Sequence, residues 1–286
     1  MEKVKIPLVS FCITTYNHEQ YIEDCLLAAI KQDYTGEMEI VISDDCSTDK
    51  TWDKIQNIIE EFPNINIIAN RNKTNLGIAK NTEKLWSLSR GEIIVTQDSD
   101  DISLPNRVST LVNYYESYPD VVLIDSGYNF IVDNNFYQGK IFEGVQIFDI
   151  DRFFSKKRME TDGYRSYRRN VITSYKQFFA STPTADSTTL LRGILIGKIM
   201  RIPDLLANYR LHPNQVSNAN NIKKINRSLI AKQYRADVFH AIKQHYFSRK
   251  YIFKVLVFVY RYSLIASLNQ SEIYIRYIKP LIKHIK

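Results

Sequence analysis

Residues 92–101 have the sequence EIIVTQDSDD, in which the mostly apolar run Glu92–Thr96 is followed by polar and acidic residues. A short run of apolar and β-branched residues that ends at a polar cluster is typical of a strand buried on both faces of a sheet. We therefore expect a buried strand here, and we expect it to carry acidic residues at its carboxyl end: Asp98, Asp100 and Asp101.

The same pattern recurs on both sides of this stretch. Four more apolar runs predict strands, at Pro7–Ile13, Glu39–Ile42, Asn66–Ala69 and Val121–Asp125. Segments with helical spacing of apolar residues separate these runs, for example Gly77–Leu88. Strands that alternate with helices of about a dozen residues predict βαβ units and a parallel, doubly wound sheet.

Polar clusters follow three of the predicted strands: Thr14–Asn17, Asp44–Asp45 and Asp98–Asp101. Ligands of doubly wound sheets bind outside the carboxyl ends of the strands, so these clusters predict one binding site. So many carboxylates at one edge would repel one another without a cation. Hard divalent cations take oxygen ligands and bind diphosphates through one or two carboxylates, so the sequence predicts a metal at this edge.

Composition and charge exclude several classes of protein. With 286 residues, 44% hydrophobic and 24% charged, the chain is neither disordered, nor collagen-like, nor a disulfide-stapled mini-protein. Its three cysteines lack metal-ligand spacing, and its N-terminus lacks a signal-peptide pattern, so we expect a reduced, cytoplasmic protein. From Lys223 to Lys286, fourteen Lys and Arg residues stand against two acids, which predicts an anionic partner for this tail.

Six sequence blocks stand in a fixed order: VSFCITTYN at Val9–Asn17, VISDDCSTD at Val41–Asp49, Asn75–Gly77 with Asn81 and Gly91–Glu92, Asp98–Pro105, Asp186–Ile199, and Ile202–Ser217. Together they resemble the family 2 glycosyltransferases with the GT-A fold, over roughly residues 6–217. The fourth block is similar to that family's D-x-D metal motif. The family's processive-polymerase signature Q-x-x-R-W is absent, which favours an enzyme that adds a single sugar.

The resemblance implies a mixed, mostly parallel α/β sheet with a C-terminal helical extension. It implies a catalytic domain over residues 1–221, with a nucleotide-binding half at 1–125 and an acceptor-binding half at 126–221. A basic, aromatic helical tail then occupies residues 222–286. Residues 126–180 carry no regular pattern, and we expect a helix over 184–200 followed by a strand over Leu205–Leu211.

The resemblance also implies roles for individual residues. Asp186 would be the general base, and Asp100 the main protein ligand of Mn²⁺ or Mg²⁺. The residues implied to bind the nucleotide sugar are Thr14, Tyr16, Asp44, Asp45, Asn75, Asp98, Ser99, Arg192 and His212. The sequence departs from the family at Ala185, which replaces the acid that precedes the base.

Structural alternatives exist for several of these residues. Asp186 could cap a helix, and His212 could be an ordinary loop histidine. Arg192 and Arg210 could pair with carboxylates rather than contact phosphate. Glu160 and Asp162 could touch the acceptor, although exposed loop charges are the better interpretation.

The tail segment Tyr251–Leu268 is strongly apolar but is interrupted by Lys254 and Arg261. A membrane-spanning helix needs about 20 mostly apolar residues, and central cations are costly there. The segment therefore favours a helix that lies in the interface of an anionic membrane, with a packing or dimerising helix as the alternative. Nucleic acid is disfavoured because no reading motif is present. The expected location is the cytoplasm, peripheral on the inner face of the cell membrane.

The function expected from the whole is an inverting transfer of a sugar from a nucleotide sugar, with UDP preferred. The acceptor would be a hydroxyl of a glycan or of a polyprenyl-diphosphate-linked intermediate in surface polysaccharide biosynthesis, such as O-antigen or capsule. A nucleotidyltransferase is disfavoured, because Thr14–Asn17 lacks a Gly-rich, basic phosphate loop. A non-catalytic nucleotide-sugar-binding or scaffold protein on the same fold remains the alternative, and Ala185 is the feature that points to it.

Overall fold

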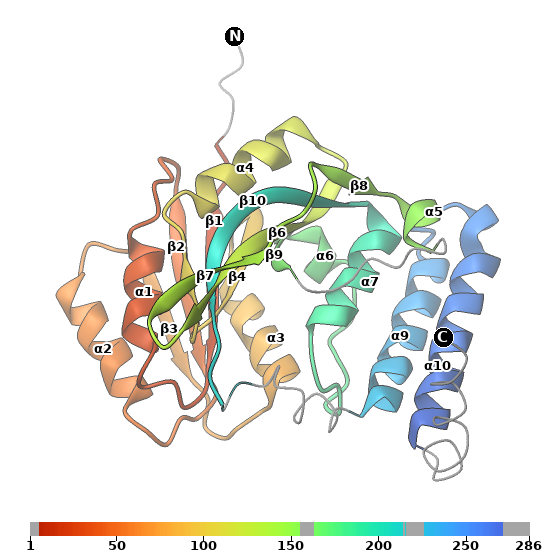
Figure 1. Ribbon diagram of the computed structural model, residues 1–286. Helices are drawn as coiled ribbons and strands as arrows, with labels where there is room; N and C mark the ends of the chain where they lie inside the picture. The colour runs from red at the N-terminus through yellow and green to blue at the C-terminus, as the bar shows by residue number, and fades with distance from the viewer. Residues whose placement is uncertain (1–5, 155–162, 214, 216–225, 271–286) are drawn as a thin grey trace.

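The computed structural model describes residues 6–154, 163–213, 215 and 226–270, and its strands form one mixed sheet with helices on both faces (Figure 1). The first half of the chain alternates strands and helices as predicted. Its elements are β1 (Val9–Thr15), α1 (Ile22–Ile30), β2 (Met38–Asp44), α2 (Thr51–Glu61), β3 (Ile67–Arg71), α3 (Ile78–Leu88) and β4 (Ile93–Asp98).

The second half begins with a two-residue strand and is less regular. Its elements are β5 (Ile102–Ser103), α4 (Arg107–Ser117), β6 (Val121–Val132), β7 (Asn135–Lys140), β8 (Gln146–Phe148), α5 (Ile150–Phe153), β9 (Tyr164–Arg168), α6 (Asn170–Thr173), α7 (Asp186–Ile196), β10 (Lys198–Arg210), α9 (Arg227–Lys243), the 3₁₀ turn η1 (Arg249–Tyr251) and α10 (Ile252–Gln270). All five strands predicted within the first 125 residues are present, and the fifth extends beyond Asp125 to Val132. The strand predicted over Leu205–Leu211 corresponds to the last part of the longer strand β10.

The strand order is β3-β2-β1-β4-β9-β6-β10-β5, with β7 paired to β6 and β8 to β10. Strands β3, β2, β1 and β4 pair in parallel, as do β6 and β10. Strand β9 is antiparallel to both of its neighbours, β4 and β6. The prediction of a mixed, mostly parallel sheet is therefore confirmed, although β9 itself was not predicted.

The helix predicted over 184–200 is too long, because α7 ends at Ile196 and Lys198 already begins β10. Gly197 marks the change of direction. A Cβ atom at this position would lie 2.6 Å from the side chain of Val122, so only glycine lets the chain pass this close to β6. The segment Ile199–Ile202, which is apolar except for Arg201, is thus a buried strand rather than the end of a helix.

Two apolar layers hold the helices on the sheet. One layer joins α1, α2 and α4 to one face, and the other joins α3 and α7 to the opposite face. The second layer also includes Ile230, Tyr234 and Val238 of α9 and Val255 and Val259 of α10. Helices α9 and α10 therefore pack against the sheet and α7 through a shared core. The predicted boundary at residue 221 falls outside the described residues, so it stays a prediction.

Helices α9 and α10 lie side by side at the end of the molecule opposite α2 and β3 (Figure 1). Within the part of the chain that the structure describes, no helix combines the length and the apolar character that crossing a membrane requires.

Candidate active site

The three predicted polar clusters lie at one edge of the sheet. Strands β2 and β4 flank β1 in parallel, with Thr15 in register with Asp44 and Thr14 in register with Asp98. The hydroxyl of Thr14 donates a hydrogen bond to Oδ1 of Asp98 at 3.2 Å. The strand ends thus meet as the sequence predicted, and Tyr16 stands 43% exposed beside them.

The turn after β1 contains a left-handed residue and contacts the loop after β2. Asn17 has φ +54°, a conformation that asparagine tolerates better than most residues. The backbone amide of Asn17 donates a hydrogen bond to Oγ of Ser47 at 2.9 Å. Its side-chain oxygen accepts a hydrogen bond from the backbone amide of Thr48 at 2.9 Å. The turn also carries Tyr16. The two hydrogen bonds therefore fix the position of Tyr16 relative to Asp44 and Asp45.

Asp44 and Asp45 occupy different environments. Asp44 is fully buried, and burial raises its pKa although the Ser47 hydroxyl and amide and the Arg71 guanidinium, 3.4 Å away, act in the opposite direction. Both carboxylate oxygens of Asp45 accept backbone hydrogen bonds, from Leu76 at 2.8 Å and Gly77 at 2.9 Å. Asp45 therefore holds the loop before α3 against the strand ends.

That loop carries Asn75, whose side-chain oxygen accepts from the Gly77 amide at 3.0 Å. Gly77 has φ +78°, which side-chain-bearing residues rarely adopt. The loop brings exposed Asn75 to the same edge as Asp45, as its predicted role requires.

The acidic residues after β4 are crowded. Burial raises the pKa of Asp98 to about 7, and the neighbouring charges of Asp100 and Asp186 add to the effect. Asp101 is buried and accepts hydrogen bonds from the Tyr164 hydroxyl and, at 2.8 Å, from the Arg210 amide. Burial and then the charges of Asp100 and Asp98 raise its pKa well above the usual range. A cation beside these groups would relieve the repulsion.

Two histidines complete a candidate metal centre around Asp100. Nε2 of His212 lies 3.0 Å from Oδ2 of Asp100, and Nδ1 of His18 lies 2.7 Å from Oγ of Ser99. One ligand atom from each of His18, Asp100 and His212 can be chosen so that all three lie within 4.8 Å of one another. Two imidazole nitrogens and one carboxylate oxygen form a donor set that suits first-row transition metals; Mn²⁺ accepts such mixed ligands, whereas Mg²⁺ prefers oxygen ligands alone.

His18 was not predicted as a site residue. Burial lowers the pKa of His18, although the charge of Asp100 acts in the opposite direction. A lowered pKa favours the neutral imidazole, which is the form that ligates a metal. The signal in the sequence was its position directly after the Thr14–Asn17 turn, because that turn was already assigned to the site edge.

Asp186 is the first residue of α7, and its side chain is 76% exposed. Its Oδ1 atom lies 3.8 Å from Nη1 of Arg165, a buried residue of β9. The effect of Asp186 on the pKa of Asp98 places both carboxyl groups in one electrostatic neighbourhood. The N-cap position belongs to Ala185, so the alternative role of Asp186 as a helix cap is wrong.

Arg192 does not face the strand edge. Its side chain is 2% exposed and pairs with Asp237 of α9 through two hydrogen bonds, Nε to Oδ2 at 2.8 Å and Nη2 to Oδ1 at 2.9 Å. Its guanidinium also lies 4.3 Å from the ring centroid of Phe178. The predicted contact of Arg192 with the nucleotide sugar is therefore corrected: the structural ion pair accounts for this residue.

Arg210 also has structural partners, since its Nε donates to the carbonyl of Asp100 at 2.9 Å and its Nη2 lies 3.2 Å from Asp24. It thereby fixes the backbone of the metal motif. Ser217, Glu160 and Asp162 lie outside the described residues, so the contacts with the acceptor weighed for Glu160 and Asp162 stay predictions.

Comparisons with known proteins agree with this arrangement. The family model described as Glycosyl transferase family 2 matches residues 10–175. A Haemophilus influenzae protein named as an uncharacterized glycosyltransferase is 28% identical over 243 residues, which are 78% of this chain and 73% of that protein. Over 119 residues, the abequosyltransferase RfbV of Salmonella typhimurium is 36% identical, covering 41% of this chain and 35% of RfbV.

Solved structures show the same fold. S. aureus TarS 1–349 in complex with UDP superposes with a TM-score of 0.62 at 20% identity, covering 81% of this chain and 64% of TarS 1–349. The mannosyltransferase PcManGT from Pyrobaculum calidifontis, in complex with GDP-Man and Mn²⁺, has a TM-score of 0.61 at 17% identity, covering 93% and 74%. At these identities the likeness concerns the fold.

Proposed function

Because the chain belongs to glycosyltransferase family 2 and has the GT-A fold, we propose that it is an inverting transferase that uses a UDP-sugar as donor. The observation that carries this proposal is the convergence of Asp100 and two histidines beside Asp98 at one sheet edge, with Asp186 of α7 held 3.8 Å from Arg165 of the neighbouring strand β9. Structural neighbours have been solved with UDP, UDP-GlcNAc and GDP-Man, which supports a nucleotide sugar and favours UDP.

The donor would lie across the ends of β1, β2 and β4. Tyr16 is exposed on the turn after β1, where its ring can stack on the base. Asp45 would reach the nucleoside while it holds the loop that carries Asn75. Thr14 and Asp98 would line the path from ribose to diphosphate at the strand ends. Asp44 and Ser99 are fully buried, so they would support this path from beneath the surface.

The proposed metal, expected as Mn²⁺ or Mg²⁺, would be held by Asp100 together with His212 and His18, and the two imidazole donors favour Mn²⁺ over Mg²⁺. When bound, such an ion supplies Lewis-acid stabilisation of the charge that develops on the leaving diphosphate. Ser99 would orient the His18 ring through the contact to Nδ1, because partners of this kind fix ligand orientation. Arg210 would keep the Asp100 backbone in place.

The chemistry at the acceptor falls to Asp186. An acceptor hydroxyl is a poor nucleophile at neutral pH, so a carboxylate within hydrogen-bond reach takes its proton during attack. The exposed position of Asp186 leaves it accessible to an acceptor, and Arg165 would hold its orientation. Attack on the face opposite the diphosphate inverts the anomeric carbon, and no covalent sugar–enzyme intermediate is needed.

We further propose a glycan or a polyprenyl-diphosphate-linked molecule as the acceptor, in the assembly of a surface polysaccharide such as O-antigen or capsule. The basic tail supports the lipid-linked version, which would place the protein at the inner face of the cell membrane. Ala185, which is buried next to the base, leaves the non-catalytic alternative to be tested.

Calorimetric titration of UDP into the protein, with Mn²⁺ and then with excess chelator, tests the donor site. We expect binding that depends on the metal. GDP serves as the comparison ligand. Tighter binding of GDP than of UDP would assign a GDP-sugar as the donor in place of a UDP-sugar. No binding of either nucleotide in either condition would overturn the proposed donor site.

A further inference from the structure

The outward face of α10 is apolar although the described part of the protein leaves it exposed. Phe253 is 79% exposed, Tyr260 71% and Leu264 49%. With Leu256 and Val257 they recur every three to four residues, so they share one face of the helix. We call this set, Phe253, Leu256, Val257, Tyr260 and Leu264, the outer face of α10.

The opposite side of α10 already accounts for its packing. Val255, Val259 and Ala266 are buried against the rest of the fold, and α9 is the main neighbour of α10. The intramolecular fold therefore requires only one apolar side of α10. A second apolar side of this extent marks an interaction surface rather than scattered exposed residues.

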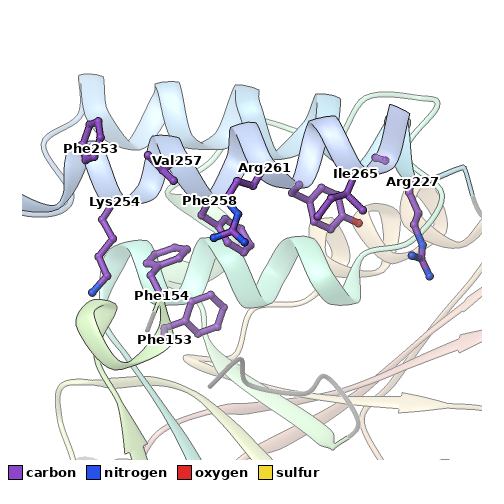
Figure 2. A pocket seen from close by; sticks show the side chains of 11 residues that line it. Phe153, Phe154, Arg227, Phe253, Lys254, Val257, Phe258, Arg261 and Ile265 are labelled. Carbon is purple, nitrogen blue, oxygen red and sulfur yellow. The ribbon is translucent and has the colours of Figure 1, made fainter. Parts of the chain in front are cut away.

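A groove of about 590 Å³ runs beside the outer face (Figure 2). Phe153 and Phe154, at the end of α5, line it together with Val257 and Ile265 of α10. Arg261 lies on the border between the groove and the outer face and is itself exposed. The apolar surface thus continues from the helix into the groove and is bordered by a cation.

The charge of this region is predominantly positive, although exposed Asp151 of α5 pairs with Lys254 at 2.7 Å beside the groove. Within residues 226–270 the chain has eight Lys and Arg residues and a single acid, Asp237. Asp237 is buried and paired with Arg192, so it contributes no negative charge to the surface. Two copies of such a surface would repel each other, whereas anionic phospholipid headgroups complement it.

We propose that the outer face of α10, with its adjoining groove, docks on an anionic phospholipid bilayer. The apolar side chains enter the boundary between headgroups and acyl chains, and Arg261 stays at the level of the phosphates, as long cationic side chains do at interfaces. This inference rests on the surface alone and does not depend on the proposed transfer reaction.

Sedimentation of the full chain with sucrose-loaded vesicles tests the proposal. Vesicles of phosphatidylcholine are compared with vesicles that also contain phosphatidylglycerol. We expect binding to the anionic vesicles, weakened by salt. The triple variant Phe253→Ser/Tyr260→Ser/Leu264→Ser should bind at least about tenfold more weakly, because three inserting apolar side chains are lost.

The matched control is Phe136→Ser, which removes a 66% exposed phenylalanine from β7, outside this surface. It should bind vesicles like the parent. Arg261→Glu should weaken binding to the anionic vesicles and leave UDP binding unchanged, which separates this surface from the donor site.

Two results would overturn the proposal. One is absence of parent-chain binding to anionic vesicles, and the other is equal binding by the triple variant and Phe136→Ser. The competing occupant of the outer face is a second copy of this chain, and light scattering after size exclusion tests for it. A dimer that the triple variant loses would assign the outer face to that second copy.

Discussion

Nε2 of His212 lies 3.0 Å from Oδ2 of Asp100, although 112 positions separate the two residues in the chain. The contact follows from the course of β10. The backbone amide of Arg210, the last residue of this strand, donates a hydrogen bond to Asp101 at 2.8 Å. The end of the sheet's returning strand is thereby tied to the acidic motif after β4. On the other side, His18 reaches the same motif through Ser99.

This arrangement predicts that both histidines contribute to metal affinity. His212→Asn and His18→Asn should each weaken Mn²⁺ binding about tenfold or more, since each removes a donor from a three-residue set. Titration followed by electron paramagnetic resonance measures free Mn²⁺ directly, without nucleotide or turnover. His245→Asn, at an exposed position outside the site, is the control. Unchanged affinity in His18→Asn would remove that residue from the centre.

A separate prediction concerns Asp186. Asp186→Asn should lower kcat by about 10²–10⁴-fold, the usual contribution of a general base, while UDP binding stays within about twofold. Asp53→Asn is the matched control, because Asp53 is an exposed acid in the first turn of another helix. An active Asp186→Asn enzyme would reject the base assignment. A protein that has no turnover in any form but binds UDP would favour the non-catalytic alternative.

Much of the fold could be predicted because the parallel strands are local apolar runs. The strand ends then place polar clusters at one edge without knowledge of any long-range contact. Strand β9 lacks such a signal, since its sequence YRSYR is rich in arginine and tyrosine. The burial of Arg165 there depends on long-range partners, chiefly Asp125 of β6, 40 positions away, which accepts a hydrogen bond from its Nε at 3.0 Å.

The errors at the site have the same origin. Arg192 lies in a sequence block that resembles a known motif, and its actual partner, Asp237, is 45 positions further on, in the segment interpreted as a separate tail. His18 was missed because its neighbours Asp100 and His212 come from two distant strand ends. Local sequence patterns therefore locate the site at the edge of the sheet. Which residues complete the site depends on contacts between distant parts of the chain.

The ion pair of Arg192 leads to a stability prediction. Arg192→Met should lower the free energy of unfolding by about 3 kcal/mol, because Asp237 is left buried without its counter-charge. Urea denaturation measures the loss. Replacing both residues, as Arg192→Met/Asp237→Leu, should restore part of it, and UDP affinity of the folded variants should not change. A stable Arg192→Met protein that fails to bind UDP would reinstate the nucleotide contact.

Glu39 of β2 is fully buried, and burial raises its pKa. Hydrogen bonds from the Ser10 hydroxyl at 2.6 Å and from the Arg90 backbone and side chain outweigh this effect, so the folded-state pKa lies below its ordinary value of 4.5. A depressed pKa means that the native state binds fewer protons than the unfolded chain. Stability from Glu39 is thus present above pH 4.5 and is lost as pH falls through the folded-state pKa.

Glu39→Gln should therefore cost about 2 kcal/mol at pH 7, where hydrogen bonds to a charged acceptor are lost, and the difference from the parent should shrink below about pH 4. Denaturation in urea across this pH range measures it. Glu61→Gln, at an exposed position near the end of α2, controls for the change in net charge. A difference of constant size at all pH values would show that Glu39 stabilises the fold through shape alone. That outcome would rule out the carboxylate as the source, since only an ionised acceptor loses its hydrogen-bond advantage on protonation.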